Sequence, residues 1–187
     1  MRRKDRQMDA AFGLQIIDKA AYAVVSVVDE LGCPYSIPIS PVRIGDVIYF
    51  HSAQGGRKVE LLTEGKPMCM VFVGDVQVPE LYSEEELKVM EHDELRATEL
   101  TRRVFTTEYE SAIVKGKILK VQDEEERAKA FRAISMKYCP SKERLIDSAI
   151  RAGGGRAFIY AVGIDELTAK RKKYDASGEE IKSRDKV

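Results

Sequence analysis

The chain has 187 residues, 44% of them hydrophobic, which is enough to bury the core of one domain without disulfides or a structural metal. Its 31 basic and 31 acidic residues balance, so no overall field favours nucleic acid or an anionic membrane as a partner. Three widely spaced cysteines lack metal-ligand spacing, and no apolar run reaches membrane-spanning or signal-peptide length, so we expect a reduced, cytoplasmic protein without a metal site.

The hydrophobic pattern predicts six strands. An amphipathic helix over Asp9–Ala20 is expected to precede a meander of the first three. The second strand contains Pro38 and Pro41, which cannot donate ladder hydrogen bonds, so it should be bulged or lie at a sheet edge. Gly116 indicates a bulge or a close backbone approach in the fifth predicted strand. The predicted strands are Tyr22–Asp29, Tyr35–Arg43, Val47–Ser52, Met68–Gly74, Tyr109–Val121 and Arg156–Ile164.

Between the strands, helices are predicted over Arg57–Thr63, Asp123–Met136 and Lys142–Ile150. The segment Glu80–Glu99 is strongly acidic and is predicted to be a partly helical surface excursion. Residues 170–187 have almost no apolar content and are expected to be a disordered or loosely docked charged tail, which leaves residues 1–169 as the single domain. Six strands with short connections predict a mainly-β fold: a six-stranded antiparallel split β-barrel with peripheral helices.

One stretch has the composition of an anion site. The third strand ends in His51 and Ser52, and Gly55-Gly56 then leads into Arg57-Lys58 at a predicted helix start. Glycines allow close approach of a ligand to the backbone, and a guanidinium beside an ammonium can neutralise a phosphate. By itself the stretch is more often a solvated basic turn, because two charges beside two glycines are common on surfaces.

The chain resembles the 5-nitroimidazole-resistance branch of the pyridoxamine 5′-phosphate oxidase-like flavoproteins. The resemblance covers nearly the whole chain, and the order of its motifs matches. It rests on Tyr49-Phe50-His51-Ser52-Ala53, Gly56-Arg57-Lys58, Met1-Arg2-Arg3-Lys4-Asp5-Arg6, Pro34-Tyr35 with Pro38, Tyr109-Glu110-Ser111, and Lys137-Tyr138 with Pro140. It implies a split-barrel homodimer that binds FMN at the subunit interface. It also implies a flavin-dependent oxidoreductase that reduces the nitro group of 5-nitroimidazoles or similar small acceptors, with electrons from an external donor such as NAD(P)H or a reductase.

The resemblance also implies the site residues. Arg57 and Lys58 correspond to phosphate ligands, with the Ser52 hydroxyl beside them. His51 corresponds to a histidine near the flavin and the substrate pocket. The strand that lines the flavin ring and the remaining cofactor contacts correspond to Pro38, Ile39, Ser40, Pro41, Val42, Phe50, Tyr109 and Ser111.

Several alternatives stay open at this stage. His51 could donate a proton during nitro reduction, or it could only hydrogen-bond the cofactor or a strand-end carbonyl. Tyr109 could stack on the flavin or fill the core. The same barrel could also be a non-catalytic module that binds flavin, haem or another small ligand, or a relative that uses a deazaflavin, because one fold hosts many functions.

Overall fold

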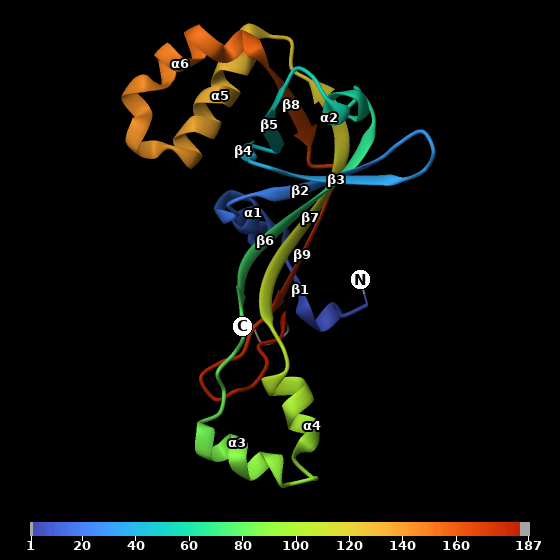
Figure 1. Ribbon diagram of the computed structural model, residues 1–187, viewed down its shortest axis with the longest axis vertical. Coiled ribbons are helices and arrows are strands. Elements are labelled where there is room, and N and C mark those ends of the chain that lie inside the picture. Colours follow the sequence, from blue (N-terminus) through green and yellow to red (C-terminus); the bar gives the residue numbers. More distant parts are fainter. Residues whose placement is uncertain (1, 184–187) are drawn as a thin grey trace.

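The computed structural model describes residues 2–183, and its centre is an antiparallel β-sheet with helices around it (Figure 1). The strands are β1 Gln7–Met8, β2 Ala23–Val28, β3 Pro34–Ile39, β4 Val42–Ile44, β5 Val47–Ala53, β6 Pro67–Gln77, β7 Glu108–Lys120, β8 Ala157–Gly163 and β9 Glu166–Lys172. The α-helices are α1 Ala10–Lys19, α2 Arg57–Leu61, α3 Glu84–Glu91, α4 Ala97–Glu99, α5 Glu124–Tyr138 and α6 Ile146–Gly153. Short 3-10 segments are η1 Lys4–Arg6, η3 Pro140–Leu145 and η4 Gly154–Arg156, and η2 Leu100–Val104 is a π-helical turn.

Strand β7 is the centre of the sheet, in which the main strand order is β3-β2-β6-β7-β8-β5-β4. One edge of β7 pairs with β6. The other edge pairs first with β9 and then, from Ile118 to Lys120, with β8. Because all of these pairings are antiparallel, the predicted mainly-β antiparallel class with peripheral helices is confirmed.

The predicted strand count of six is wrong, because the structure has nine strands in residues 2–183. The predicted strand Tyr35–Arg43 is divided into β3 and β4 around Ser40 and Pro41, where the proline has no N–H to continue a ladder. The two pieces lie at opposite ends of the strand order, β3 beside β2 and β4 beside β5. The edge position expected from the prolines is therefore confirmed. The two short or charged strands β1 and β9 were not predicted.

Gly116 is a position of close backbone approach, as the sequence indicated. A Cβ there would lie 2.2 Å from the carbonyl oxygen of Gly163 and 2.7 Å from a methyl carbon of Val162. At this point the edge of β7 that does not pair with β6 changes its partner strand from β9 to β8. Only a residue without a side chain lets the connection between those strands lie this close to β7.

The main hydrophobic core lies between α1 and the strands β2, β5, β6, β7 and β8. Helix α1 begins at Asp9, whose carboxylate accepts a hydrogen bond from the N–H of Phe12 at 2.8 Å. Ile16 and Ile17 on this helix are fully buried. At Gly13, a Cβ would already meet Leu167 at 3.1 Å, so the absence of a side chain lets α1 lie close to β9.

A second, smaller core lies under α5, which covers β4, β5 and β8. Asp123 caps this helix by accepting a hydrogen bond from the N–H of Glu126 at 2.8 Å. Ala130 and Ile134 are its buried positions, and Tyr49 of β5 donates a hydrogen bond to the Glu126 carboxylate at 2.8 Å. Helix α5 therefore fixes the end of the sheet that holds the predicted anion site.

The acidic segment forms a protrusion at the far end of the molecule, where β6 and β7 lead into α3 and α4 (Figure 1). Helix α3 starts with a capping box in which the Ser83 hydroxyl and the Glu86 carboxylate each accept a backbone hydrogen bond. The prediction of a partly helical excursion is confirmed. No helix within residues 2–183 is long and apolar enough to cross a membrane.

The predicted boundary between domain and tail at residues 169 and 170 falls inside β9, which continues to Lys172. Beyond it, Tyr174 is buried and forms a bridge with Glu180, and Glu180 pairs with Arg6 near the N-terminus. Of the two expected alternatives, disordered or loosely docked, the structure therefore shows a docked segment over residues 170–183. Residues 184–187 of that predicted tail lie outside the described part of the chain. Strand pairing and ion pairing order this segment despite its low apolar content.

Candidate functional site

The end of β5 is held against β8, where Phe50 faces Tyr160 and Ser52 faces Phe158 in the register. Phe50 is fully buried and stacks on Tyr160 with ring centroids 5.3 Å apart. Ser52 is 1% exposed, and its hydroxyl donates a hydrogen bond to the carbonyl of Ala53 at 2.9 Å. Neither side chain reaches the surface, so a ligand at this strand end would first meet other groups.

The basic pair follows β5 directly, on the first turn of α2. Gly56 precedes this helix with φ +93°, a conformation that glycine adopts without strain. The Arg57 side chain is 60% exposed and forms an ion pair of 3.2 Å with the carboxylate of Asp29, in the turn between β2 and β3. Its guanidinium also lies 5.7 Å from the ring centre of Tyr35 on β3. Arg57 is therefore oriented by two neighbouring groups while most of its fork stays accessible.

His51 lies on the opposite face of β5 from Phe50 and Ser52, because successive side chains of a strand alternate. Its ring centre is 6.5 Å from that of Phe131 on α5. Partial burial, and then the positive charge of Lys58, hold the pKa of His51 below its ordinary value. The imidazole is consequently neutral near pH 7, and its ring can donate a hydrogen bond more readily than a proton.

The predicted flavin-lining segment, residues 38–42, is the end of β3, its connection and the start of β4. Val42 pairs with Tyr49, so this segment lies beside β5. The carbonyl of Pro41 accepts two hydrogen bonds from the end of α5, from the Tyr138 hydroxyl at 2.9 Å and the Lys137 ammonium at 3.1 Å. Of the remaining predicted contacts here, Pro38 and Ser40 are exposed and Ile39 is buried.

Burial shifts the pKa of both anchoring groups. It lowers the pKa of Lys137 and raises the pKa of Tyr138 to about 12. The tyrosine hydroxyl therefore stays protonated at physiological pH and donates a hydrogen bond to the Pro41 carbonyl.

Tyr109 and Ser111 do not join this group within one subunit. They lie on the half of β7 that pairs with β6 and β9, whereas the half beside β8 begins at Ile118. Ile118 follows Ser111 by seven strand positions, which corresponds to about 23 Å. Tyr109 is half-buried, and the Lys170 ammonium lies 5.6 Å from its ring centre.

The structure therefore places the start of β4 beside β5, Lys58 near His51, and the start of α2 against the β2–β3 turn. It adds Asp29 and Tyr35, which sequence reasoning did not assign to the site. The signal was weak, because Asp29 has the appearance of an ordinary turn residue and its role as a partner of Arg57 depends on the packing of α2 against the β2–β3 hairpin.

The family model described as pyridoxamine 5′-phosphate oxidase matches residues 10–86. The predicted resemblance to the pyridoxamine 5′-phosphate oxidase-like proteins is confirmed. The part of the chain that this family model matches contains Arg57, Lys58 and residues 38–42, and it ends before Tyr109 and Ser111.

Solved structures share the fold. A candidate 5-nitroimidazole antibiotic resistance protein from Bacteroides thetaiotaomicron is 22% identical, with 88% of this chain and 86% of that chain covered and a TM-score of 0.63. An FAD and haem binding protein from Mycobacterium smegmatis is 21% identical over 89% of this chain and 73% of that chain, with a TM-score of 0.67. A flavocytochrome from Azotobacter vinelandii is 19% identical over 96% of this chain and 79% of that chain, with a TM-score of 0.62. No curated protein matches the chain.

Proposed function

We propose that the chain is a flavin-dependent oxidoreductase that binds FMN and reduces nitroaromatic or similar small acceptors, with electrons from an external donor such as NAD(P)H or a reductase. The observation that supports it best is the accessible Arg57 fork beside Lys58, inside the segment that the family model matches. A fork and an ammonium together suit the phosphate at the end of a flavin.

The residues present fit such a phosphate. A Cβ placed on Gly55 or Gly56 would meet no atom within 4 Å, so the approach to the start of α2 is open. Asp29 holds the Arg57 fork through one ion pair, and 60% of the side chain stays exposed. We assign phosphate binding to Arg57 and Lys58 and support of the flavin ring to the polar backbone of residues 38–42.

In this proposal the protein orients and the cofactor reacts. A bound flavin supplies hydride and single-electron transfer. His51, neutral because of burial and Lys58, offers a ring N–H as a hydrogen-bond donor beside the site. The hydroxyl of Tyr138 and the ammonium of Lys137 fix the connection on which the ring would rest.

A second candidate is a non-catalytic flavin or haem binding protein. It is favoured by the similarity to an FAD and haem binding protein and by the lowered pKa of His51, which makes a proton donor scarce at neutral pH. Both candidates require a bound cofactor, and only the first requires electron transfer to an acceptor.

Flavin loading followed by reoxidation tests both. We expect the purified protein to bind FMN, and the double variant Arg57→Gln, Lys58→Met to bind it about 100-fold more weakly, because each charge-assisted hydrogen bond contributes about 1.5–3 kcal/mol. Absorbance and flavin fluorescence titrations measure this. The matched control Lys142→Met, Arg144→Gln alters two exposed basic residues of η3 and should bind like the wild type.

Protein reduced with dithionite is then mixed anaerobically with a 5-nitroimidazole. Reoxidation of the flavin supports the oxidoreductase, and reduced flavin that stays unchanged favours the binding protein. A wild-type protein that neither carries nor takes up flavin contradicts both candidates.

A further inference from the structure

We propose a second ligand site, separate from the flavin site: a cationic cavity that binds a small phosphate-bearing molecule. The cavity has a volume of about 550 Å³, within the range of roughly 300–1,000 Å³ typical of small-molecule sites. It lies where β9 ends, whereas the Arg57–Lys58 pair lies at the opposite end of the sheet, beside β5 (Figure 1).

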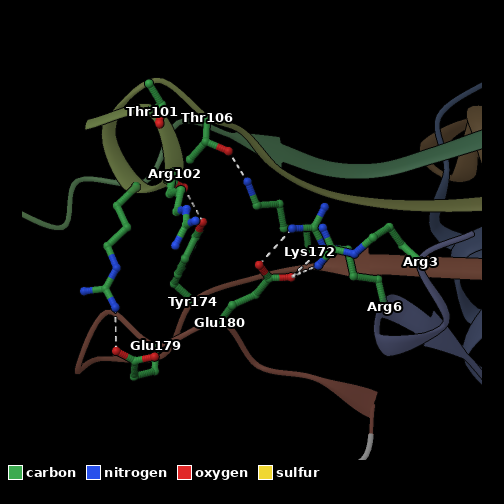
Figure 2. A pocket seen from close by; sticks show the side chains of 10 residues that line it. Arg3, Arg6, Thr101, Arg102, Thr106, Lys172, Tyr174, Glu179 and Glu180 are labelled. Carbon is green, nitrogen blue, oxygen red and sulfur yellow. Dashed lines mark hydrogen bonds and ion pairs between the residues drawn. The ribbon is translucent and has the colours of Figure 1, made fainter. Parts of the chain in front are cut away.

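Segments that are far apart in sequence build its wall. Strand β1 near the N-terminus pairs with β9, and the C-terminal segment folds back so that Ile181 N–H donates to the Lys173 carbonyl at 2.8 Å. The Tyr174 hydroxyl donates to the carbonyl of Arg102 at 2.7 Å and joins β9 to the π-helical turn η2 (Figure 2). The walls of the cavity are therefore held by strand pairing and hydrogen bonds, and its mouth is open to solvent.

The lining is strongly cationic. It carries five basic side chains and two acidic ones, an excess of three positive charges: Arg3, Arg6, Arg102, Arg103 and Lys172 against Glu179 and Glu180. The two acids each neutralise neighbouring arginines. Glu180 pairs with Arg6 at 2.5 Å, and Glu179 pairs with Arg103 at 2.5 Å.

Lys172 forms no ion pair of its own among residues 2–183, because the Glu180 carboxylate that attracts it already pairs with Arg6 and Arg3. It is 8% exposed, and its ammonium is hydrogen-bonded to the Thr106 hydroxyl and lies 5.5 Å from the ring centre of Tyr174 (Figure 2). Among residues 2–183 it has no carboxylate within ion-pairing distance. A buried charge is costly unless it is paired, so this arrangement is the one expected for a site completed by an anion.

Arg102 provides the second free cation. Its side chain lines the cavity and forms no ion pair with any residue from 2 to 183. A planar guanidinium, an ammonium and the hydroxyl of Thr106 form a donor set that suits phosphate oxygens. Because Lys172 is recessed, a nucleic-acid backbone or a membrane surface would not reach it, and a small molecule would.

Calorimetric titration with inorganic phosphate, pyrophosphate and ADP at constant ionic strength tests the site, on protein kept saturated with FMN so that the Arg57–Lys58 site is filled. We expect at least one of these probes to bind. Lys172→Met and Arg102→Gln should each weaken that binding at least 10-fold. The control Arg144→Gln changes an exposed arginine of η3 that belongs to neither site, so it should bind like the wild type.

The comparison of the three probes shows which part of the ligand is recognised. Equal affinities for pyrophosphate and ADP would mean that the site recognises the phosphates alone. A higher affinity for ADP would mean that the natural ligand also carries a nucleoside. Arg102 is exposed, so its variant should fold even where Lys172→Met does not. Binding that Arg102→Gln leaves unchanged overturns the proposal, as does the absence of binding by all three probes.

The Arg57→Gln, Lys58→Met variant, titrated without FMN, separates this proposal from the flavin assignment. Retained pyrophosphate or ADP binding supports a separate site, even if FMN binding itself fails in the wild type. Loss of all anion binding in that variant overturns it, because the flavin site would then be the source of the signal.

Discussion

Gly116 is the residue on which the geometry of the sheet depends most directly. The carbonyl of Gly163 occupies the space that its side chain would need, and a carbonyl of the backbone cannot turn away as a flexible side chain could. The nearby N–H of Asp165 donates to the carbonyl of Lys115 at 3.1 Å and keeps the two segments together. An added methyl group must therefore separate β7 from the β8–β9 connection.

We expect Gly116→Ala to lower the free energy of unfolding by about 1–3 kcal/mol, the cost typical of overpacking in a well-packed interior. Urea denaturation followed by circular dichroism measures it. Gly155→Ala is the control, because a Cβ there meets no atom within 4 Å. Equal midpoints for the two variants would show that the connection can move aside at little cost.

Among the elements, helix α5 positions the candidate site through its C-terminal end. Its last turn directs the Tyr138 hydroxyl and the Lys137 ammonium to the same carbonyl, that of Pro41. Pro41 lies in the connection between β3 and β4, outside the ladders of both strands, and the helix supplies the donors for its carbonyl instead.

The variant Tyr138→Phe should lose about 1 kcal/mol of unfolding free energy, the net contribution of one hydrogen bond, because Lys137 still satisfies the carbonyl. Thermal and urea unfolding measure the loss, and flavin affinity should fall with it if the connection supports the ring. Tyr22→Phe, at a half-exposed tyrosine before β2, serves as the comparison and should be neutral. A Tyr138→Phe variant as stable as the wild type would contradict the anchoring role.

At the scale of the whole molecule, the separation of Ser111 from Arg57 is the main feature to be explained. Ser111 lies on the outer face of β7, across from Val73, and Ile113 on the same face is 38% exposed. The opposite face, with Ala112 and Val114, is fully buried. We propose that a second copy of the chain covers this outer face around Val73 and Ile113 and brings its own basic pair near Ser111, which would complete a site that one subunit leaves divided.

Size-exclusion chromatography with light scattering should then give twice the chain mass of 21.1 kDa. Ile113→Lys places a charge in the covered face, so it should yield monomers and weaken flavin binding. Val89→Lys, at a 61% exposed valine on the distant α3, should leave the dimer intact. A wild-type monomer that binds FMN tightly would contradict the proposed arrangement.

Local sequence determined much of this protein. Alternation and β-branched runs located the principal strands, Asp9 and Asp123 marked two helix starts, and Gly116 and Pro41 marked a close approach and a broken ladder. These features depend on the conformational limits of single residues and on short-range hydrogen bonds, so a sequence alone reveals them. The Gly56-Arg57-Lys58 motif was likewise visible before its surroundings were known.

Only the tertiary structure decided the rest. The charged segment Glu166–Lys172 becomes a strand because the edge of β7 is available to it, and Lys172 is buried because Tyr174, β1 and the returning C-terminus close around it. Strand pairing also determined which predicted site residues are buried and which lie far apart. It buries Phe50 and Ser52, and it places Tyr109 and Ser111 on a distant part of β7. Such contacts join residues separated by up to 177 positions, as Arg3 and Glu180 are, and no local pattern encodes them.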